Sequence, residues 1–346
     1  MRIALTCDPE LPVPPQFYGG IERVVDMLAR RLVVRGHELT LFAHPSSQCP
    51  VPKRAWPGAS SLSRFDTFRN AGELARAIAG QRFDIIHSFS RLAYLAPLLP
   101  SAIPKLMTYQ REISPRTTGL AQRLSRGTLQ FSAISEHMVR HVRHIGAWHI
   151  VPNGVPSETY TFREQIPDDA PLVFLGRVEE IKGPHLAIAA ARLAGRRLVI
   201  AGNLAAEHRA WFEAHIAPHL HDGDIDYVGP VDDRQKNQLL GGAAALLMPI
   251  LWEEPFGIVM AEAMACGSPV IGFDRGAVPE VVEHGRTGYV VDTVEEMAAA
   301  IARLESIERA ACRQRVETLY SEDAVTDRYL QIYEAMIARR GSRAAA

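Results

Sequence analysis

Short β-prone apolar runs alternate with helical segments along most of the chain, and this alternation starts afresh after residue 152. A strand that is followed by a helix and then by another strand favours a parallel sheet with helices packed on its faces. The strand-like runs are IALT, ELTLFA, FDIIHSF, KLMTY and QFSAIS in the first half, and PLVFLGR, RRLVIAGN, IDYVG, AALLMPI and SPVIGF in the second. The sequence therefore predicts an α/β protein with two doubly wound domains.

The two predicted domains are separated by the segment VPNGVP, residues 151–156. Two prolines and an Asn-Gly pair are typical of a turn or hinge and not of a helix or a central strand. With 346 residues and about 150 residues in an average domain, two domains are the expected number. We place the boundary between Pro152 and Val155, so that the N-terminal domain spans residues 1–152.

The composition is that of a folded globular protein, with 47% hydrophobic and 22% charged residues. The longest nearly uncharged apolar stretch, Leu239–Trp252, has 14 residues, whereas a membrane-spanning helix needs about 20. Asp8 and Pro9 interrupt the N-terminal sequence too early for the apolar region of a signal peptide. These features predict a cytoplasmic protein. Four widely spaced cysteines without CxxC spacing are expected to be buried small side chains (Cys7, Cys49, Cys266 and Cys312).

Charge is distributed unevenly, although the net charge of the chain is only −1. Residues 1–152 contain 19 Lys and Arg against 10 Asp and Glu, a balance of +9, and the remainder has a balance of −10. Two explanations are open: attraction between the halves, or an anionic partner for the basic half, either an anionic acceptor or the inner face of a membrane. We expect no nucleic-acid partner. The best membrane contact is the helix predicted for residues 21–35, through Arg23, Arg30, Arg31 and Arg35, with Val24, Val25, Leu28 and Leu32 packed on the sheet.

Two glycine-containing segments follow predicted strands. GGIE, which contains Gly19 and Gly20, lies between the first strand and its helix, where backbone N–H groups at a helix N-terminus favour a phosphate. GRVEEIKG places Gly176 and Arg177 at a strand end and Lys182 in the following loop. A planar guanidinium and an ammonium together suit a diphosphate. The alternatives are an ordinary loop for the first segment and solvated charges for the second.

The segment EEPFGIVMAEAMACG contains two glutamates eight residues apart, Glu254 and Glu262. Pro255 suits the first position of a helix and Gly267 suits its end, so one helix is predicted between them. Eight residues correspond to roughly 12 Å along a helix, too far for the carboxylate pair of a glycosidase or for one shared metal ion. We expect the two glutamates to hold separate parts of an extended ligand such as a sugar nucleotide. The alternatives are a first-turn charge that complements the helix dipole and a solvated glutamate.

These motifs together resemble the family 4 retaining glycosyltransferases of the group 1 type. The run from Glu253 to Val291 is similar to the family's E-x7-E region, and GGIE, VPNGV and GRVEEIKG precede it in the expected order. The resemblance implies the GT-B fold, two Rossmann-like doubly wound domains that face each other across a cleft. It also implies that the C-terminal helix, about residues 322–346, returns to the acceptor-side domain, which leaves 153–321 as the donor domain.

The resemblance implies transfer of a hexose from a nucleoside diphosphate sugar to a hydroxyl acceptor, with retention of configuration and with neither a metal ion nor a further cofactor. UDP- and GDP-linked donors remain open, as do glycan, lipid-linked and small-molecule acceptors. Catalytic roles fall on Arg177, Lys182 and Glu254, and the two cations would neutralise the departing diphosphate. Donor binding falls on backbone groups and on a ribose-binding glutamate: Gly19, Gly20, Gly176, Phe256, Gly257, Ile258, Val259 and Glu262.

One position departs from the family pattern. Relatives often carry a histidine after a strand of the first domain, where this chain reads MTYQRE. Gln110 can hydrogen-bond a sugar hydroxyl but cannot carry a proton. Gln110 and the adjacent Arg111 are candidates for the acceptor side. His87, at the end of FDIIH, is either a further cleft residue or a buried structural histidine.

The acidic string HDGDID, residues 221–226, lacks the remaining positions of a calcium loop, so we predict a turn and no metal site. Two other functions remain open. A sugar-nucleotide epimerase of the GT-B type would leave its product attached to the nucleotide. A catalytically silent nucleotide-sugar binding protein would bind the donor without turnover.

Overall fold

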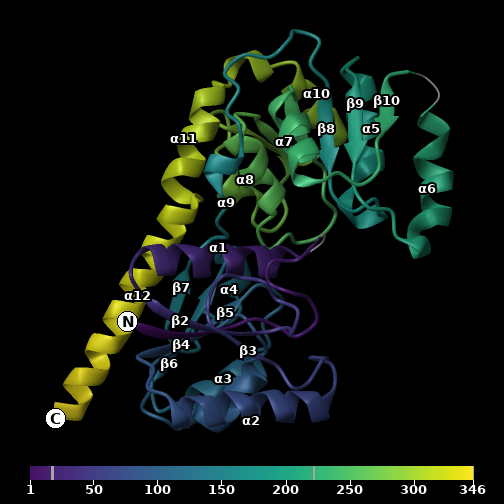
Figure 1. The fold of residues 1–346 in the computed structure, drawn as a ribbon. Helices are drawn as coiled ribbons and strands as arrows, with labels where there is room; N and C mark the ends of the chain where they lie inside the picture. Colours follow the sequence, from purple (N-terminus) through teal and green to yellow (C-terminus); the bar gives the residue numbers. More distant parts are fainter. Residues whose placement is uncertain (17–18, 221–222, 346) are drawn as a thin grey trace. The chain divides into compact units, whose positions relative to one another are not determined.

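The computed structural model describes residues 1–16, 19–220 and 223–345, and the chain divides into two compact units (Figure 1). Unit 1 consists of residues 1–154 together with the C-terminal segment from Glu322, and unit 2 consists of residues 155–321. The boundary between the units along the chain therefore falls directly after the Asn-Gly pair of the predicted hinge. His221 and Asp222 of the acidic string HDGDID lie outside the described residues.

Unit 1 is built on a parallel sheet with the strand order β3-β2-β1-β4-β5-β6-β7. Ile3 in the central strand pairs with Leu39 on one side and with Ile85 on the other. Because the chain starts in the middle and winds outward in both directions, the unit is doubly wound, as predicted. The strands are β1 (Arg2–Thr6), β2 (Glu38–Ala43), β3 (Lys53–Ala55), β4 (Ile85–Ser88), β5 (Lys105–Tyr109), β6 (Leu129–Ala133) and β7 (Trp148–Ile150).

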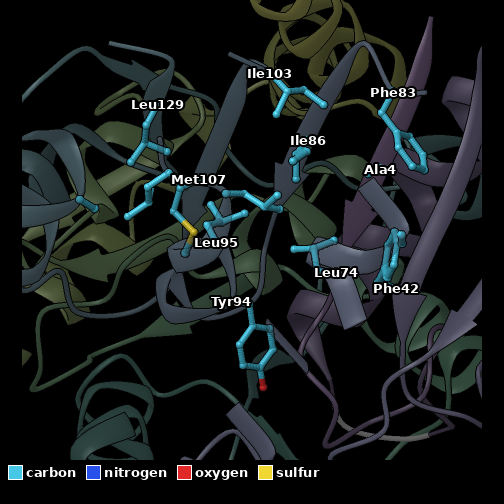
Figure 2. Close-up of a cluster of buried hydrophobic side chains, with 14 of the residues drawn as sticks. Ala4, Phe42, Leu74, Phe83, Ile86, Tyr94, Leu95, Ile103, Met107 and Leu129 are labelled. Atoms are coloured by element: carbon cyan, nitrogen blue, oxygen red, sulfur yellow. The ribbon is translucent and has the colours of Figure 1, made fainter. Parts of the chain in front are cut away.

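Helices cover both faces of the unit 1 sheet (Figure 1). On one face, Leu74 of α2, Leu95 of η1 and Ala121 of α3 join the strand residues Ile86 and Met107 in one buried apolar cluster (Figure 2). Such contiguous burial supplies most of the stabilisation of a domain. The helices of this unit are α1 (Gly20–Val34), α2 (Arg64–Gly80), η1 (Leu92–Leu98), α3 (Pro115–Leu124), α4 (Glu136–Val139) and α12 (Glu322–Ala345).

Helix α1 packs its apolar stripe inward, as predicted, but its arginines are engaged. Arg30 pairs with Asp26 at 2.7 Å, Arg31 pairs with Glu322, and Arg35 reaches Asp323 and Asp327 in α12 at 2.9 and 2.5 Å. These ion pairs fasten the start of α12 to α1, and they neutralise the charges that we expected to face an anionic membrane. The prediction of α1 as the membrane contact therefore loses its basis. It did not take into account that the acidic first turn of α12 lies beside these arginines. The buried stripe is Val24, Val25, Leu28 and Leu32.

Unit 2 repeats the architecture with a parallel sheet in the order β10-β9-β8-β11-β12-β13, so that the prediction of two doubly wound α/β domains is confirmed. Its strands are β8 (Leu172–Leu175), β9 (Leu198–Ala201), β10 (Ile225–Tyr227), β11 (Ala245–Met248), β12 (Val270–Phe273) and β13 (Gly288–Val291). Its longer helices are α5 (Pro184–Leu193), α6 (Arg209–His215), α7 (Asp233–Gly241), α8 (Ile258–Ala265), α9 (Val278–Val281), α10 (Val294–Ile301) and α11 (Arg309–Leu319). Its 3₁₀ turns are η2 (Ser157–Thr159), η3 (Glu180–Lys182), η4 (Ala206–His208), η5 (Ala217–His219) and η6 (Leu304–Ser306).

Strands β3, β7 and β13, which are three or four residues long and lie at sheet edges, were not predicted. The polar run of β3 in particular carries no apolar strand signal. All four cysteines are buried and free, as predicted. In the part of the chain that the structure describes, no helix combines the length and the apolar character needed to cross a membrane.

Candidate active site

Lys182 and Glu254 meet at the carboxyl edge of the unit 2 sheet. Strands β8 and β11 are neighbours, so the loops that follow them lie side by side, and this edge is where open α/β sheets bind ligands. The Leu251 N–H donates to the carbonyl of Ile181 at 2.9 Å, which joins the two loops. The Lys182 ammonium then donates to Oε2 of Glu254 at 2.8 Å. The structure thus brings together two residues for which the sequence predicted catalytic roles.

Trp252 is a third member of this cluster that the sequence analysis did not identify. Its indole N–H donates to the same Oε2 of Glu254 at 3.1 Å, and the Lys182 ammonium lies 4.5 Å from the centroid of its ring. The side chains of Lys182 and Glu254 are 18% and 11% exposed. One carboxylate oxygen of Glu254 therefore orients both the Lys182 ammonium and the Trp252 ring. Because this sheet edge is largely shielded from water, the ammonium would attract an anionic ligand more strongly here than in bulk water.

Glu254 does not lie in a helix, which corrects the prediction of one helix from Pro255 to Gly267. Helix α8 begins at Ile258 and is preceded by Gly257, whose φ of 71° lies in the left-handed region that interrupts a right-handed helix. The rise of roughly 12 Å between the glutamates assumed a continuous helix and does not apply. The alternative of a first-turn charge on the helix dipole is wrong for the same reason.

The backbone of Glu254 is held instead by the loop that follows β12. The Ala277 N–H donates to the Glu254 carbonyl at 2.8 Å, and the Gly276 N–H donates to the Glu253 carboxylate at 2.7 Å. A Cβ atom on Gly276 would lie 2.3 Å from the Glu254 carbonyl oxygen, and its φ is 58°. A glycine is therefore required here for two reasons, space and backbone conformation. Loops after three adjacent strands thus fix Glu254.

Arg177 lies in the loop after β8 but in a separate ion-pair network. Its guanidinium lies 2.8 Å from Oε1 of Glu179, and the other oxygen of this buried carboxylate lies 3.1 Å from the imidazole of His208. The Arg177 side chain remains 46% exposed, so it is available to a ligand from solvent. Gly176 precedes Arg177. The carbonyl oxygen of Gly176 would lie 1.7 Å from a Cβ atom on Gly202, so Gly202 must be a glycine.

Glu262 is buried in α8 with two hydrogen-bond donors. Its Oε1 accepts from the hydroxyl of Tyr160 at 2.6 Å and from the ammonium of Lys236 in α7 at 2.6 Å. Burial, reinforced by the Glu262 charge, raises the pKa of Tyr160. The residue is 7% exposed, so the alternative of a solvated glutamate is wrong. A carboxylate that is already oriented by two donors is suited to bind neutral hydroxyls with its remaining capacity.

The other donor-side residues surround the start of α8. The Phe256 ring is buried and packs edge-on against Tyr320 at 5.6 Å, so only its backbone could contact a ligand. Ile258 and Val259 are half-buried. The first N–H groups of any α-helix lack intrahelical partners and favour an anion. Gly257 places these groups at the carboxyl edge of the sheet.

In unit 1, the predicted glycine loop leads into α1, with Gly19 at the N-cap and Gly20 as the first helical residue. A Cβ atom on Gly20 would meet nothing within 4 Å, whereas one on Gly19 would meet the Glu22 carboxylate at 2.8 Å. Glu22 is buried, and burial raises its pKa. The outer side of Gly20 is therefore the part of this loop that leaves room for a ligand.

Asp8, Gln110 and Arg111 line one cavity of about 310 Å³ at the carboxyl edge of the unit 1 sheet. Asp8 accepts from the Arg91 N–H at 3.1 Å and from the Arg111 guanidinium at 3.0 Å, and burial raises its pKa while Arg111 opposes this shift. Gln110 accepts from the Asn153 amide at 3.1 Å, and its own buried Nε2 has no partner. A carboxylate and an amide side chain thus contribute to the lining of this cavity, and both types of group suit sugar hydroxyls.

His87 is not in this cavity, and the structure decides between its two interpretations. The residue is completely buried. Its Nδ1 lies 2.5 Å from the hydroxyl of Tyr333 in α12, and its Nε2 lies 2.6 Å from the Thr108 hydroxyl. Burial lowers the pKa of His87 to about 3, so the imidazole is neutral at physiological pH. His87 joins α12 to the sheet, as expected of a buried structural histidine.

Four residues at these sites were not predicted from the sequence: Asp8, Trp252, Tyr160 and Lys236. Asp8 follows β1 at the carboxyl edge, where polar residues commonly contact ligands, and this signal could have identified it. Trp252 is two residues from Glu254, but Tyr160 and Lys236 carry no local signal. Among the described residues, no group of three or more His, Cys, Asp or Glu side chains is arranged to hold a metal ion.

Comparison with known families identifies the family of this chain. Residues 157–318 match the family described as glycosyl transferases group 1, and residues 18–159 match glycosyltransferase family 4. The chain belongs to the group 1 glycosyltransferases of family 4. This glycosyltransferase is 25% identical to the phosphatidyl-myo-inositol mannosyltransferase of Mycobacterium tuberculosis, over 97% of both chains. The resemblance to this family that the sequence motifs indicated is therefore confirmed.

Solved structures show the same fold. A glycosyltransferase from Rickettsia africae has a TM-score of 0.81 at 19% identity, with coverage of 97% of this chain and 98% of that one. Anabaena HepE, determined in complex with UDP and glucose, has a TM-score of 0.72 at 18% identity and covers 97% of this chain and 100% of its own. The predicted GT-B fold, with two Rossmann-like parallel-sheet domains, is confirmed.

Proposed function

We propose that this glycosyltransferase transfers a hexose from a nucleoside diphosphate sugar to a hydroxyl acceptor, with retention of configuration and without a metal ion. The observation that carries the proposal is the Lys182–Glu254 pair at the carboxyl edge of the unit 2 sheet, beside the start of α8. A cation that is held in place before the ligand arrives needs little reorganisation when negative charge develops on a leaving phosphate. Unit 2 is accordingly the donor domain.

In the proposed reaction, the bond between the anomeric carbon and the β-phosphate oxygen breaks, and the acceptor oxygen bonds to that carbon on the same face. The acceptor proton passes to the departing phosphate, so no nucleophilic side chain is needed. Lys182 and the half-exposed Arg177 neutralise the diphosphate. Glu254, which orients Lys182, also accepts a hydrogen bond from the donor sugar.

Glu262 binds the ribose in this proposal. Tyr160 and Lys236 both contact Oε1, and we assign Oε2 to the ribose hydroxyls. The backbone at Phe256, Gly257, Ile258 and Val259 faces the sugar and the phosphates. The outer side of Gly20 in unit 1 gives the diphosphate room to approach the start of α1.

Unit 1, residues 1–154 with α12, receives the acceptor. Because Gln110 cannot carry a proton, we assign it to hydrogen-bond an acceptor hydroxyl through its unpartnered Nε2. Asp8 and Arg111 lie in the same cavity, and Asp8 accepts a second hydroxyl. The near-balanced charge of the Asp8–Arg111 pair favours a neutral polyol ring at this point over a strongly anionic group.

The relatives support a sugar nucleotide as donor without identifying it. Anabaena HepE was solved with UDP and glucose, and the mycobacterial relative is a mannosyltransferase. UDP- and GDP-linked hexoses are therefore the donors to test first.

The test is a release assay in EDTA, in which UDP- and GDP-hexoses are incubated with a mixture of sugar, inositol and lipid-linked acceptors. The proposal predicts nucleoside diphosphate release that depends on an acceptor, together with a product that has the anomeric configuration of the donor. Conversion of the sugar while it remains on the nucleotide would indicate an epimerase. Donor binding without any turnover across the acceptors would indicate a silent binding protein, and inversion of configuration would contradict retention.

A further inference from the structure

Glu179 is a buried carboxylate in the loop that carries the two cations assigned to the diphosphate. It follows Arg177 by two positions and precedes Lys182 by three, and its side chain is 5% exposed. A negative charge beside an anion-binding site opposes the binding of the anion, and burial of an ionised carboxylate is itself unfavourable. The proposed reaction gives no reason for an acid at this position, so its contacts call for an explanation.

The Glu179 carboxylate contacts a basic group with each oxygen. Oε1 lies 2.8 Å from the Arg177 guanidinium, and Oε2 lies 3.1 Å from the imidazole of His208 at the end of η4. Because η4 follows β9, the strand next to β8, the carboxylate is held from outside its own loop. Oε1 accepts no hydrogen bond, so the ion pair keeps the guanidinium near Glu179 without an aligned N–H group.

Backbone contacts fix the same loop. The Val178 N–H donates to the Asn203 carbonyl at 3.0 Å, and the Val178 side chain is completely buried. The Glu179 N–H donates to the Arg177 carbonyl at 3.1 Å, and the Glu179 carbonyl accepts from the Lys182 N–H at 3.1 Å. Glu179 therefore connects the two cations, through its side chain to Arg177 and through its backbone to Lys182.

We propose that Glu179 is a positioning residue that holds Arg177 at the donor site, and that His208 keeps the Glu179 carboxylate turned toward Arg177. The Arg177 side chain is half-exposed, and a long, flexible side chain loses conformational freedom when it is fixed on a ligand. An ion pair with a buried carboxylate removes part of this freedom before the ligand arrives, so the guanidinium needs less reorganisation to meet the diphosphate. The inference rests on the proposed function, because it assumes that Arg177 contacts the diphosphate.

The next residue along the chain provides a matched control. Glu180 carries the same charge as Glu179 but is exposed. If the two acids acted only through their electric field, removal of either charge would leave the affinity for an anion unchanged or raise it. A positioning role predicts the opposite sign at Glu179 alone, namely a loss of affinity when its negative charge is removed.

The experiment is calorimetric titration of the full chain with UDP and with GDP in EDTA. It compares the parent with Arg177→Ala, Glu179→Gln, Glu180→Gln and the double variant Arg177→Ala/Glu179→Gln. Thermal unfolding of each variant checks its fold. If Glu179→Gln does not fold, His208→Gln replaces it with the same expected direction, because the His208 side chain is 35% exposed and tolerates substitution better than a buried one.

We expect Arg177→Ala and Glu179→Gln each to bind the nucleoside diphosphate about tenfold more weakly than the parent, because a charge-assisted hydrogen bond to the phosphate is lost or weakened. Glu180→Gln should bind as tightly as the parent or more tightly. In the Arg177→Ala background, Glu179→Gln should cause no further loss, because the residue that it positions is absent.

Unchanged or tighter binding by Glu179→Gln would overturn the proposal. The same loss from Glu179→Gln in both backgrounds would also overturn it, because Glu179 would then act without Arg177. If Arg177→Ala bound like the parent, the assignment of Arg177 to the diphosphate would be wrong, and this inference would be overturned with it. A failure of the positioning role alone is therefore distinguished by a weakened Arg177→Ala beside an unaffected Glu179→Gln.

Discussion

The Lys182 ammonium lies 2.8 Å from Oε2 of Glu254, although the two residues are 72 positions apart in the chain. Two neighbouring strands bring them together, and Trp252 contacts both. The lysine is thus oriented before any ligand binds, while its charge remains near the place where we assign the diphosphate.

Replacing Lys182 should impair turnover more than donor binding. In Lys182→Ala we expect kcat to fall on the order of 10²-fold or more, because the ammonium meets charge that grows in the transition state. Arg177→Ala should act in the same direction. The measurement is steady-state kinetics at saturating donor, with Arg197→Ala as control, since Arg197 is a 53% exposed cation of unit 2 that pairs with Asp226. Equal kcat in Lys182→Ala and the control would contradict the assignment.

Gly276→Ala should destabilise unit 2 and displace Glu254. Gly285→Ala should destabilise unit 2 but leave Glu254 in place. Both glycines have left-handed φ values, 58° and 78°, but a Cβ atom on Gly285 would meet nothing within 4 Å. The backbone penalty alone is about 1 kcal/mol, and the contact with the Glu254 carbonyl adds to it at Gly276. Thermal unfolding and donor affinity, measured on both variants, check this. Equal effects of the two substitutions would show that the contact has no consequence.

Glu262→Gln should weaken nucleotide binding while kcat at saturating donor stays close to that of the parent. Ribose contacts change little during the reaction, so their loss affects ground state and transition state alike. The glutamine side-chain oxygen can still accept hydrogen bonds from the Tyr160 hydroxyl and the Lys236 ammonium. This substitution therefore avoids the larger cost of leaving the Lys236 charge without a partner, as alanine would. Isothermal titration with nucleoside diphosphates gives the affinity. A large fall in kcat without a change in affinity would argue against the ribose role.

The buried His87 predicts an acid-sensitive stability. Its pKa is about 3 in the folded chain and about 6.5 when unfolded. Between these values the unfolded chain binds a proton that the folded chain does not, so stability falls as pH decreases, by up to about 1.4 kcal/mol per pH unit. His87→Gln should destabilise the protein at pH about 7.5 and less so at pH about 5, where the parent has already lost part of this contribution. Denaturant unfolding at both pH values measures the difference, and a penalty that is independent of pH would contradict it.

Periodic patterns were sufficient to predict the two doubly wound sheets, because long buried strands and their crossover helices carry strong apolar signals. The start of α8 was mispredicted since Pro255 fits a first helical position as well as it fits a loop. The left-handed conformation of Gly257 depends on packing after β11 and leaves no mark on spacing.

Residues that act through distant partners were the hardest to predict. Glu262 was identified, but its partners Tyr160 and Lys236 lie 102 and 26 positions away, and only the fold brings them together. His87 shows the same limit, because the hydroxyl of Tyr333 that binds its imidazole lies 246 positions away. Sequence patterns indicate which residues are buried better than they indicate the partner of each buried polar group.

The measurement that tests the central claim most directly needs no acceptor. Calorimetric titration in EDTA compares a nucleoside diphosphate with the corresponding nucleoside diphosphate sugar, in the parent and in Lys182→Ala. If Lys182 stabilises the charge of the leaving group, the parent should bind both ligands, and the variant should lose more affinity for the free diphosphate, which carries the extra charge, than for the sugar nucleotide. Failure of UDP, GDP and their hexoses to bind the parent, or equal affinities in the parent and the variant, would contradict the assignment of unit 2 as the donor site.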